Sequence, residues 1–369
     1  MQGEKPFRYG VLIGRFQLFH NTHKTLVEDA LKKVEELIII IGSKNATRSV
    51  KNPFTAKERV EMIKQTIEKE IPGNHKIHYV LSDDFFYNEN MWIAQIQHLV
   101  GDIVGHNRSV ALFGAYKDET SYYVNLFPQW KKKLRQSGNT MNSTSIRNKL
   151  FSDPDTDPEW CSHRGDATSR DWRSGLPKTV VEWVENNFLY ESKSPLTYTE
   201  MFKNLRGEYQ YLENYKNAWE DAPFPPTFVT VDAVVIKSGH VLVVERNGFP
   251  GKGLIALPGG FLNQDETIED GMIRELSEES NIDVPERVLR GSIINNRVFD
   301  YPHRSLRGRT ITHAYHIDLG TGPLPKVQAS SDARTARFVP IHEALSWDNK
   351  FFEDHWHILH YFFVQSRGR

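Results

Sequence analysis

The segment from Gly260 to Ile282 constrains the fold of this chain most, because its charged residues follow the fixed spacing Gly-x5-Glu-x7-Arg-Glu-x2-Glu-Glu. Glu275, Glu278 and Glu279 stand at i, i+3 and i+4, so an α-helix over 267–279 brings their carboxylates to one face. An apolar stripe by which such a helix packs on a sheet is formed by Ile268, Met272, Ile273 and Leu276. The segment therefore predicts an amphipathic helix with one acidic face.

These acids predict a site for a divalent cation. Like charges at this spacing repel one another, and hard ions such as Mg²⁺ or Mn²⁺ turn the repulsion into binding. Arg274 reaches Glu278 one turn later and can orient the acids. A solvated acidic helix is the simpler interpretation, but the preceding loop Pro258-Gly-Gly-Phe and the position of Glu266 favour the metal site.

With that loop and helix, residues 223–369 resemble the Nudix hydrolases that cleave ADP-ribose. The resemblance implies an α/β/α sandwich with a mixed sheet, in which the three glutamates and the carbonyl of Gly259 bind metal and Glu275 and Glu279 are catalytic. In this family a metal-activated water attacks a phosphorus of the pyrophosphate. The glycine that usually ends the helix is Asn281 here. Because asparagine tolerates the left-handed conformation, we expect the helix cap to remain.

A preference for ADP-ribose is implied by three arginines that resemble the family's phosphate and ribose contacts: Arg246, Arg304 and Arg307. An exposed basic hairpin is a nearly equal interpretation of residues 304–309. Some Nudix hydrolases use a glutamate from a later loop as general base, but no glutamate lies between Glu286 and Glu343. Asp332 is therefore the candidate base.

Residues 1–190 alternate strand-like and helix-like segments, which predicts a Rossmann-like domain, a parallel sheet with helices on both faces. Strands are expected at 8–13, 37–41, 77–81 and 110–113, and helices at 21–34, after the capping box at 55–58, at 90–99 and from 143. The basic run Lys131–Lys133 with Arg135 is interpreted as a solvated helix face. In residues 223–369, strands at 228–236 and 240–244 flank a hairpin turn.

The turn after the first strand predicts a phosphate site. Ligands of an open α/β sheet bind at the carboxyl ends of its strands, and Gly14 lets the backbone approach one closely. His20 and His23 lie at the start of the next helix, where free N–H groups and the helix dipole favour anions. The stretch 142–147 adds two hydroxyls and a cation: Ser143, Thr144 and Arg147. Each stretch alone also fits a capped helix start, and zinc would need a third ligand that is not evident.

Both stretches resemble the nucleotidyltransferase superfamily, and residues 7–190 are similar to nicotinamide mononucleotide (NMN) adenylyltransferases of the archaeal type. The matching motifs are Gly-Arg-Phe-Gln at 14–17, His20-x-x-His23, Lys51-Asn-Pro-Phe-Thr55 with Glu58-Arg59, and Ser-Thr-x-Ile-Arg at 143–147. Leu18, Thr22 and Asn142 depart from the family pattern. We expect these changes to shift ATP slightly rather than to abolish activity.

In that family the mononucleotide phosphate attacks the α-phosphorus of ATP without a protein nucleophile, and the site supplies positioning and charge neutralisation, with Mg²⁺ bridging phosphates. The resemblance implies catalytic roles for His20, His23 and Arg147. It implies further ATP and NMN contacts at Gly14, Arg15, Phe16, Arg48, Asp84, Trp92, Ser143 and Thr144. Asp84 and Trp92 match the nicotinamide side, where an indole stacks on the cationic ring, although a core position suits Trp92 equally well.

Composition and charge exclude several classes of protein. The 46 basic and 47 acidic side chains give a formal net charge of −1, which argues against a broad nucleic-acid surface. The one cysteine, Cys161, excludes an intrachain disulfide framework. The longest aliphatic run, 37–41, is far shorter than the ~20 residues of a membrane helix, and no signal-peptide pattern is visible. We therefore expect a cytoplasmic protein that does not bind membranes, and leave open whether it forms a homo-oligomer.

The main hypothesis is a bifunctional enzyme of pyridine nucleotide metabolism, with domains at 1–190 and 223–369 and a connector at 191–222. The first domain makes NAD from NMN and ATP, the second hydrolyses ADP-ribose to AMP and ribose 5-phosphate, and each uses Mg²⁺ or Mn²⁺. Alternatively, the second domain is a non-catalytic ADP-ribose sensor or hydrolyses another nucleoside diphosphate derivative. Sensors of this type lose the helix glutamates, which are all present here, so the enzyme is favoured. Nicotinate mononucleotide is the rival substrate of the first domain.

Overall fold

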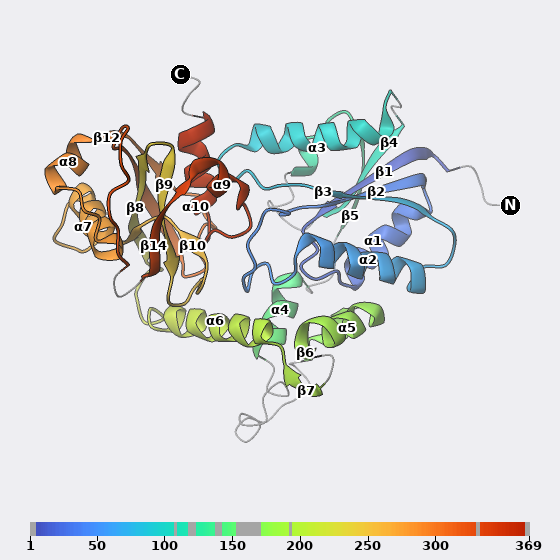
Figure 1. Cartoon of the computed structure of the whole chain (residues 1–369). Helices are drawn as coiled ribbons and strands as arrows, with labels where there is room; N and C mark the ends of the chain where they lie inside the picture. Colours follow the sequence, from blue (N-terminus) through green and yellow to red (C-terminus); the bar gives the residue numbers. More distant parts are fainter. Residues whose placement is uncertain are drawn as a thin grey trace. The chain divides into compact units, whose positions relative to one another are not determined.

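The computed structural model describes residues 5–106, 109–116, 123–136, 142–152, 171–191, 194–329 and 333–365. The chain forms two compact units, Met1–Arg206 and Gly207–Arg369, and passes from one to the other within helix α6, Glu200–Asn217 (Figure 1). This helix lies inside the connector expected from the sequence. In the part of the chain that the structure describes, no helix has both the length and the apolar character needed to cross a membrane.

The first unit is built on a five-stranded parallel sheet in the order β3-β2-β1-β4-β5. Its strands are β1 Phe7–Gly14, β2 Val34–Ile41, β3 Lys76–Leu81, β4 Val110–Tyr116 and β5 Lys131–Gln136. The side chains of Leu37–Ile41 are fully buried, as expected for a central strand covered on both faces. The strand order reverses between β1 and β4, and sheets of this kind bind ligands beyond the carboxyl ends of the strands at that point. The Rossmann-like prediction is confirmed.

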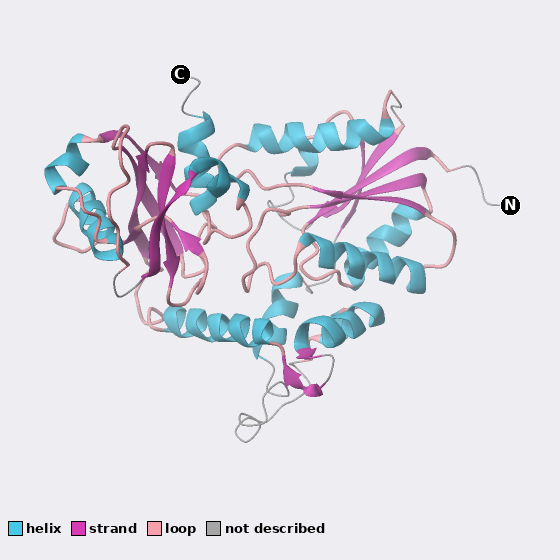
Figure 2. Cartoon of the chain, in the orientation of Figure 1, coloured by secondary structure: helices cyan, strands magenta, loops and turns pink. Residues whose placement is uncertain are grey.

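Helices cover both faces of this sheet, with α1 and α2 on one side and α3 on the other (Figures 1 and 2). The helices of the unit are α1 Asn21–Leu31, α2 Ala56–Glu70, α3 Glu89–Val104, α4 Ser143–Ser152 and α5 Lys178–Val184, with a 3₁₀ turn at Arg173–Gly175 and a π-helical turn at Glu185–Leu189. The capping box of α2 is confirmed by hydrogen bonds of 2.7 and 3.3 Å between Thr55 and Glu58. A short hairpin, β6 Tyr190–Glu191 and β7 Ser194–Tyr198, precedes α6.

The prediction that the basic run at 131–135 forms a helix face is wrong. These residues form β5, which pairs in parallel with β4 and lies at an edge of the sheet. Their side chains are exposed. Charged residues on an edge strand discourage pairing with another chain, so the lysines suit a strand here. The first helix is also shorter than expected, since it ends at Leu31 and Val34 already belongs to β2.

The second unit is a mixed sheet between two helical layers, which confirms the α/β/α prediction. β8 lies parallel to β13 and antiparallel to β9 and β11. The strands are β8 Thr227–Lys237, β9 His240–Arg246, β10 Ile255–Ala256, β11 Gly259–Phe261, β12 Ile293–Phe299, β13 Arg309–Asp318 and β14 Ala333–Pro340. Helices α7 Ile268–Ser280 and α8 Glu286–Gly291 cover one face, and α9 Ile341–Ser346 and α10 His355–His360 the other (Figure 1); a π-helical turn, Tyr361–Gln365, follows.

Two local predictions in this unit are confirmed. Helix α7 begins after the N-cap Thr267, packs its apolar stripe on β8 and β13, and ends at Asn281, which is left-handed with φ 39° and ψ 44°. The turn between β8 and β9 uses Ser238 and Gly239 at φ 48° and 74°, as a two-residue hairpin with right-handed strand twist requires. Helix α7 is therefore capped at both ends and packed on the sheet along its apolar face.

Two candidate active sites

The turn between β1 and α1 fixes two histidines at the start of the helix. His20 is the N-cap residue and is 1% exposed, and its backbone N–H donates to Nδ1 of His23 at 3.3 Å. The imidazoles stack with ring centroids 3.7 Å apart, and Phe16 meets His23 edge-on at 4.9 Å. Gly14 leaves room for that phenyl ring, from which a Cβ on Gly14 would be 2.8 Å away. Both imidazoles are held where a helix N-terminus favours an anion.

Arg147 on α4 reaches the same turn, so the structure brings the two predicted stretches together. Its guanidinium donates to the backbone carbonyl of Gln17 and, at 3.1 Å, to Oγ1 of Thr144. Ser143 donates to the carbonyl of Leu18 at 3.2 Å. Burial lowers the pKa of Arg147 to about 10, and the neighbouring positive charge of Arg15 acts in the same direction. Arg147 remains a cation at neutral pH and stands beside the turn that carries the histidines.

Arg59 is a residue of this site whose role the sequence did not reveal. Its side chain is 1% exposed and donates to the carbonyls of Arg15 at 2.5 Å, Gly42 at 2.6 Å and Ser43 at 3.0 Å. Burial lowers its pKa to about 10, opposed by the charge of Asp84. One guanidinium thus ties together the backbone that follows β1 and β2. In the sequence, the one pointer to Arg59 was its position directly after Glu58 of the capping box.

The remaining predicted contacts of the first unit come from other elements: Arg48 follows β2, Asp84 follows β3, and Trp92 is on α3. Burial raises the pKa of Asp84, while a hydrogen bond from Ser43 and nearby cations oppose the shift. Arg48 is paired with Glu58 at 2.9 Å. Trp92 is partly exposed on α3, and its ring meets Phe127 of the core at 5.8 Å. The structure supports a packing role for Trp92, and its stacking on nicotinamide stays a prediction.

Helix α7 places Glu279 directly against strand β11. The carboxylate accepts a hydrogen bond from the backbone N–H of Gly259 at 3.0 Å. Neither glycine of the loop can carry a side chain without displacing its surroundings: a Cβ on Gly259 would lie 2.1 Å from the carbonyl oxygen of Val231, and a Cβ on Gly260 would lie 2.5 Å from the carboxylate of Glu275. The two glycines let the strand lie against the acids.

Arg274 organises the other acids of the pattern. Its guanidinium donates to Glu266 at 2.8 and 2.9 Å, and its Nη1 donates to both Glu275 and Glu278 at 2.9 Å. The bond from Arg274, with a second from the N–H of Asn263, lowers the pKa of Glu266 to about 2. Among the described residues, no three acidic, histidine or cysteine side chains are gathered around one point as a formed metal site. In this structure Arg274 supplies the positive charge for the acids.

The donor set of α7 nevertheless fits a hard divalent cation. Burial raises the pKa of Glu279 to about 7; Glu275 and Asp232 add to the shift, and the Gly259 N–H and Arg246 oppose it. Burial also raises the pKa of Glu275. A carboxylate whose charged form is disfavoured by burial gains most from a cation, and carboxylate oxygens are the ligands that hard ions prefer.

Two family models match the chain, Cytidylyltransferase-like over residues 11–114 and NUDIX domain over residues 226–362. A crystal structure from Francisella tularensis, a bifunctional NMN adenylyltransferase/ADP ribose pyrophosphatase complexed with AMP and a manganese ion, is 32% identical with a TM-score of 0.82, covering 98% of this chain and 100% of that one. The chain belongs to this bifunctional family. Hydrolases with the NUDIX domain need a divalent metal, in agreement with the acids of α7.

Curated relatives of the adenylyltransferase unit match the first half of this bifunctional enzyme. A nicotinamide/nicotinic acid mononucleotide adenylyltransferase from Acinetobacter baylyi is 39% identical over 146 residues, which are 39% of this chain and 76% of the relative. A nicotinamide-nucleotide adenylyltransferase from Thermococcus sibiricus is 32% identical over 181 residues, which are 48% of this chain and 82% of the relative.

The three arginines of the pyrophosphatase unit occupy different environments. Arg246 stacks on Phe352 at 4.1 Å from the ring centroid, and Arg307 lies 4.7 Å from the centroid of Phe261 in β11. Arg304, in contrast, has a side chain that is 2% exposed and donates to both oxygens of Asp354, at 2.7 and 2.9 Å. The structure therefore places Arg246 within electrostatic reach of Glu279 and Arg307 beside β11, and buries Arg304 on Asp354.

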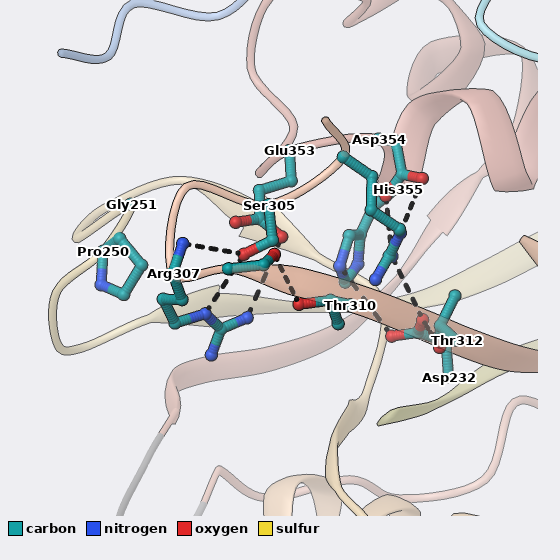
Figure 3. Close-up of polar contacts among 12 residues, drawn as sticks. Asp232, Pro250, Gly251, Ser305, Arg307, Thr310, Thr312, Glu353, Asp354 and His355 are labelled. Atoms are coloured by element: carbon teal, nitrogen blue, oxygen red, sulfur yellow. Dashed lines mark hydrogen bonds and ion pairs between the residues drawn. The ribbon is translucent and has the colours of Figure 1, made fainter. Parts of the chain in front are cut away.

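A polar network behind β11 was not foreseen from the sequence. Asp232 accepts from Oγ1 of Thr312 at 2.6 Å, and His355 accepts on Nδ1 from the N–H of Leu257 at 3.0 Å (Figure 3). Burial lowers the pKa of His355, so its ring is neutral with the proton on Nε2, toward Asp232 at 3.8 Å. No local pattern marks these partners in the sequence. The candidate base Asp332 lies outside the described residues and stays a prediction.

Proposed function

We propose that this chain carries out two reactions in separate domains, 1–190 and 223–369. The first transfers the adenylyl group of ATP to NMN, giving NAD and pyrophosphate. The second hydrolyses ADP-ribose to AMP and ribose 5-phosphate. The observation that carries the proposal is the opposite charge of the two sites, since Arg147 and two imidazoles meet at one turn and three glutamates share one face of α7. A polyphosphate suits the first site and a metal ion suits the second.

In the adenylyltransferase reaction, the side chains bind the phosphates and neutralise their charge, and they form no covalent bond with the substrate. His20, His23, Arg147 and the N–H groups at the start of α1 bind the triphosphate of ATP, with Ser143 and Thr144 alongside. The NMN phosphate attacks the α-phosphorus in line, and the pyrophosphate leaves into the same set of donors, which neutralise its charge. The nicotinamide side is assigned to Asp84 and Trp92, at the end of β3 and on α3.

In the hydrolase reaction, Glu275, Glu278 and Glu279 hold the cation, and Arg246 and Arg307 bind the pyrophosphate of the substrate. The bound ion supplies charge neutralisation and lowers the pKa of a water nucleophile. We assign Mg²⁺ or Mn²⁺ to both domains; the manganese of the Francisella relative supports this choice. We place the enzyme in the cytoplasm, because a chain with one cysteine has no need of an oxidising compartment.

Paired variants test the two reactions in one preparation. His20→Ala is expected to lower NAD synthesis at least ~100-fold, the cost typical of removing one group that stabilises developing charge, and to leave ADP-ribose hydrolysis intact. Glu279→Gln is expected to abolish ADP-ribose hydrolysis and leave NAD synthesis intact, because it removes the carboxylate that accepts from the N–H of Gly259. Chromatographic quantification of NAD and AMP measures both. Loss of both activities in either variant would contradict two independent sites.

Two outcomes would change the proposed function, one in the substrate of the first domain and one in the activity of the second. The Acinetobacter relative carries both nicotinamide and nicotinic acid mononucleotides in its name, so nicotinic acid mononucleotide is a second candidate for the first domain. Turnover of the two mononucleotides side by side with ATP decides between them. For the second domain, tight ADP-ribose binding without AMP release would favour the sensor.

A further inference from the structure

The segment 351–355 comprises the last four residues of the connection between α9 and α10 and His355, the first residue of α10, and its residues contact several parts of the pyrophosphatase unit; Figure 3 shows Glu353, Asp354 and His355. Phe351 is buried and bridges to Ile255, and Phe352 carries Arg246 on its ring. Asp354 binds Arg304, and His355 accepts from the N–H two residues before Gly259. The segment thus contacts Arg246 and Arg304 and also the backbone that leads into β11. The first residue of β11, Gly259, donates its N–H to Glu279.

Glu353, the middle residue of this segment, has a strained backbone. Its φ of 46° lies in the left-handed region, which a residue with a Cβ rarely adopts and which glycine adopts freely. The side chain is only 9% exposed, and its Oε2 lies 3.8 Å from Nη2 of Arg307, itself 12% exposed. A strained, nearly buried carboxylate next to a cation is typical of a residue retained for function.

The surroundings of Glu353 show what it can hold in place. Arg307 and Arg246 both lie over the ring of Phe352, at 5.9 and 4.1 Å from its centroid. Two guanidinium groups that share one ring repel each other. Burial lowers the pKa of Arg246, the charge of Arg307 lowers it further, and the charges of Glu353 and Glu279 oppose the shift. The carboxylate of Glu353 offsets that repulsion.

We propose that Glu353 is a positioning residue of the hydrolase site: its carboxylate fixes Arg307, and through their shared phenyl ring Arg246, in the orientation that binds the pyrophosphate of the substrate. The inference rests on the proposed ADP-ribose hydrolysis. It adds a residue that belongs to no motif of the sequence, and it gives a reason for the strained backbone at 353.

Two substitutions separate this role from a purely structural one. Glu353→Gly removes the carboxylate and relieves the backbone strain, so the variant is expected to unfold at the same temperature as the unchanged enzyme or a higher one. Glu353→Gln keeps the size of the side chain and removes its charge. Both are expected to lower kcat/KM for ADP-ribose at least ~10-fold, mainly through KM, because the lost contact orients ground-state binding groups. NAD synthesis should be unchanged in both.

Ser238→Gly is the matched control, since Ser238 has a similar φ of 48° in the hairpin between β8 and β9. It relieves strain in the same unit and should leave KM for ADP-ribose unchanged. A double variant tests the route of the effect: if Glu353 acts through Arg307, then Glu353→Gln combined with Arg307→Gln is no worse than Arg307→Gln alone. Additive losses would overturn the proposed route.

The result that would overturn the proposal is an unchanged KM and kcat in both Glu353 variants. If the unchanged enzyme itself releases no AMP from ADP-ribose, the proposed function fails instead. The role of Glu353 is then decided by calorimetric binding of ADP-ribose, which should weaken at least ~10-fold in Glu353→Gln. Equal affinity would reject the positioning role.

Discussion

At the scale of single residues, a substitution at Gly260 tests how closely β11 must pack against α7. A Cβ at this position would stand 2.5 Å from the carboxylate of Glu275, which is too close for any real contact. Glu275 would have to leave its place on Arg274. We therefore expect Gly260→Ala to lower ADP-ribose hydrolysis by about 100-fold, the cost typical of moving a reacting group by about an ångström. Initial rates of AMP release at saturating Mg²⁺ measure the loss.

Gly291→Ala is the matched control for that variant, because a Cβ on Gly291, at the end of α8, meets no atom within 4 Å. Hydrolysis by this control, and NAD synthesis by both variants, should equal those of the unchanged enzyme. Full hydrolase activity in Gly260→Ala would show that Glu275 can move without loss, and would remove it from the set of metal ligands.

Contacts between residues that are close in the sequence could be predicted, and contacts between residues that are far apart in the sequence could not. The ion pair of Arg274 with Glu278 follows from helical periodicity because both lie on α7. Glu353 and Arg307 are separated in the sequence by β13 and β14 and meet only in the folded unit, so no periodic pattern connects them. Arg304 was expected among the ligand contacts, and its burial on Asp354 depends on the same long-range folding.

At the scale of elements, the end of α7 depends on one residue in the left-handed region. Asn281 has φ 39°, and its side chain donates to the carbonyl of Gln328 at 3.3 Å. Asn281→Gly and Asn281→Ala lose the same side-chain bond, and they differ in the cost of the left-handed backbone. We expect the glycine variant to be more stable than the alanine variant by about 1 kcal/mol.

Thermal unfolding followed by circular dichroism measures this difference, which corresponds to roughly 2–4 °C in a unit of this size. The two variants should have the same ADP-ribose affinity, because the cap lies at the end of the helix and not on its acidic face. Equal unfolding temperatures would mean that the helix ends in another conformation in solution.

Elements with a strong apolar signal could be predicted, and an element with a charged surface could not. β2 is recognisable because burial on both faces requires a continuous apolar run. β5 carries three lysines and an arginine, since an edge strand is exposed, and its composition is then indistinguishable from that of a solvated helix. Strand order is also invisible locally: β13 pairs with its sequence neighbour β12 on one side and, in parallel, with the distant β8 on the other.

At the scale of the whole molecule, the near-zero net charge contains two sites of opposite charge. The formal charge is −1. In the first unit, the turn at His20 is bordered by Arg147 and a second imidazole, so a divalent ion is expected to enter with the phosphates of ATP. In the second unit we expect the ion to bind the carboxylates of α7. The two activities should therefore respond differently to metal concentration and pH.

The hydrolase should show a pH-dependent requirement for metal, because the ion competes with a proton on Glu279. Burial raises the pKa of this carboxyl to about 7, above its ordinary value, so the proton is bound below that pH and released above it. The half-saturating Mg²⁺ concentration for AMP release should increase about tenfold for each pH unit below 7 and become constant above it. For NAD synthesis, the half-saturating Mg²⁺ concentration should depend on the ATP concentration and not on pH between about pH 6 and 8. Parallel metal titrations on one preparation test this, and equal shifts of both midpoints would place the pH dependence in the substrates rather than in Glu279.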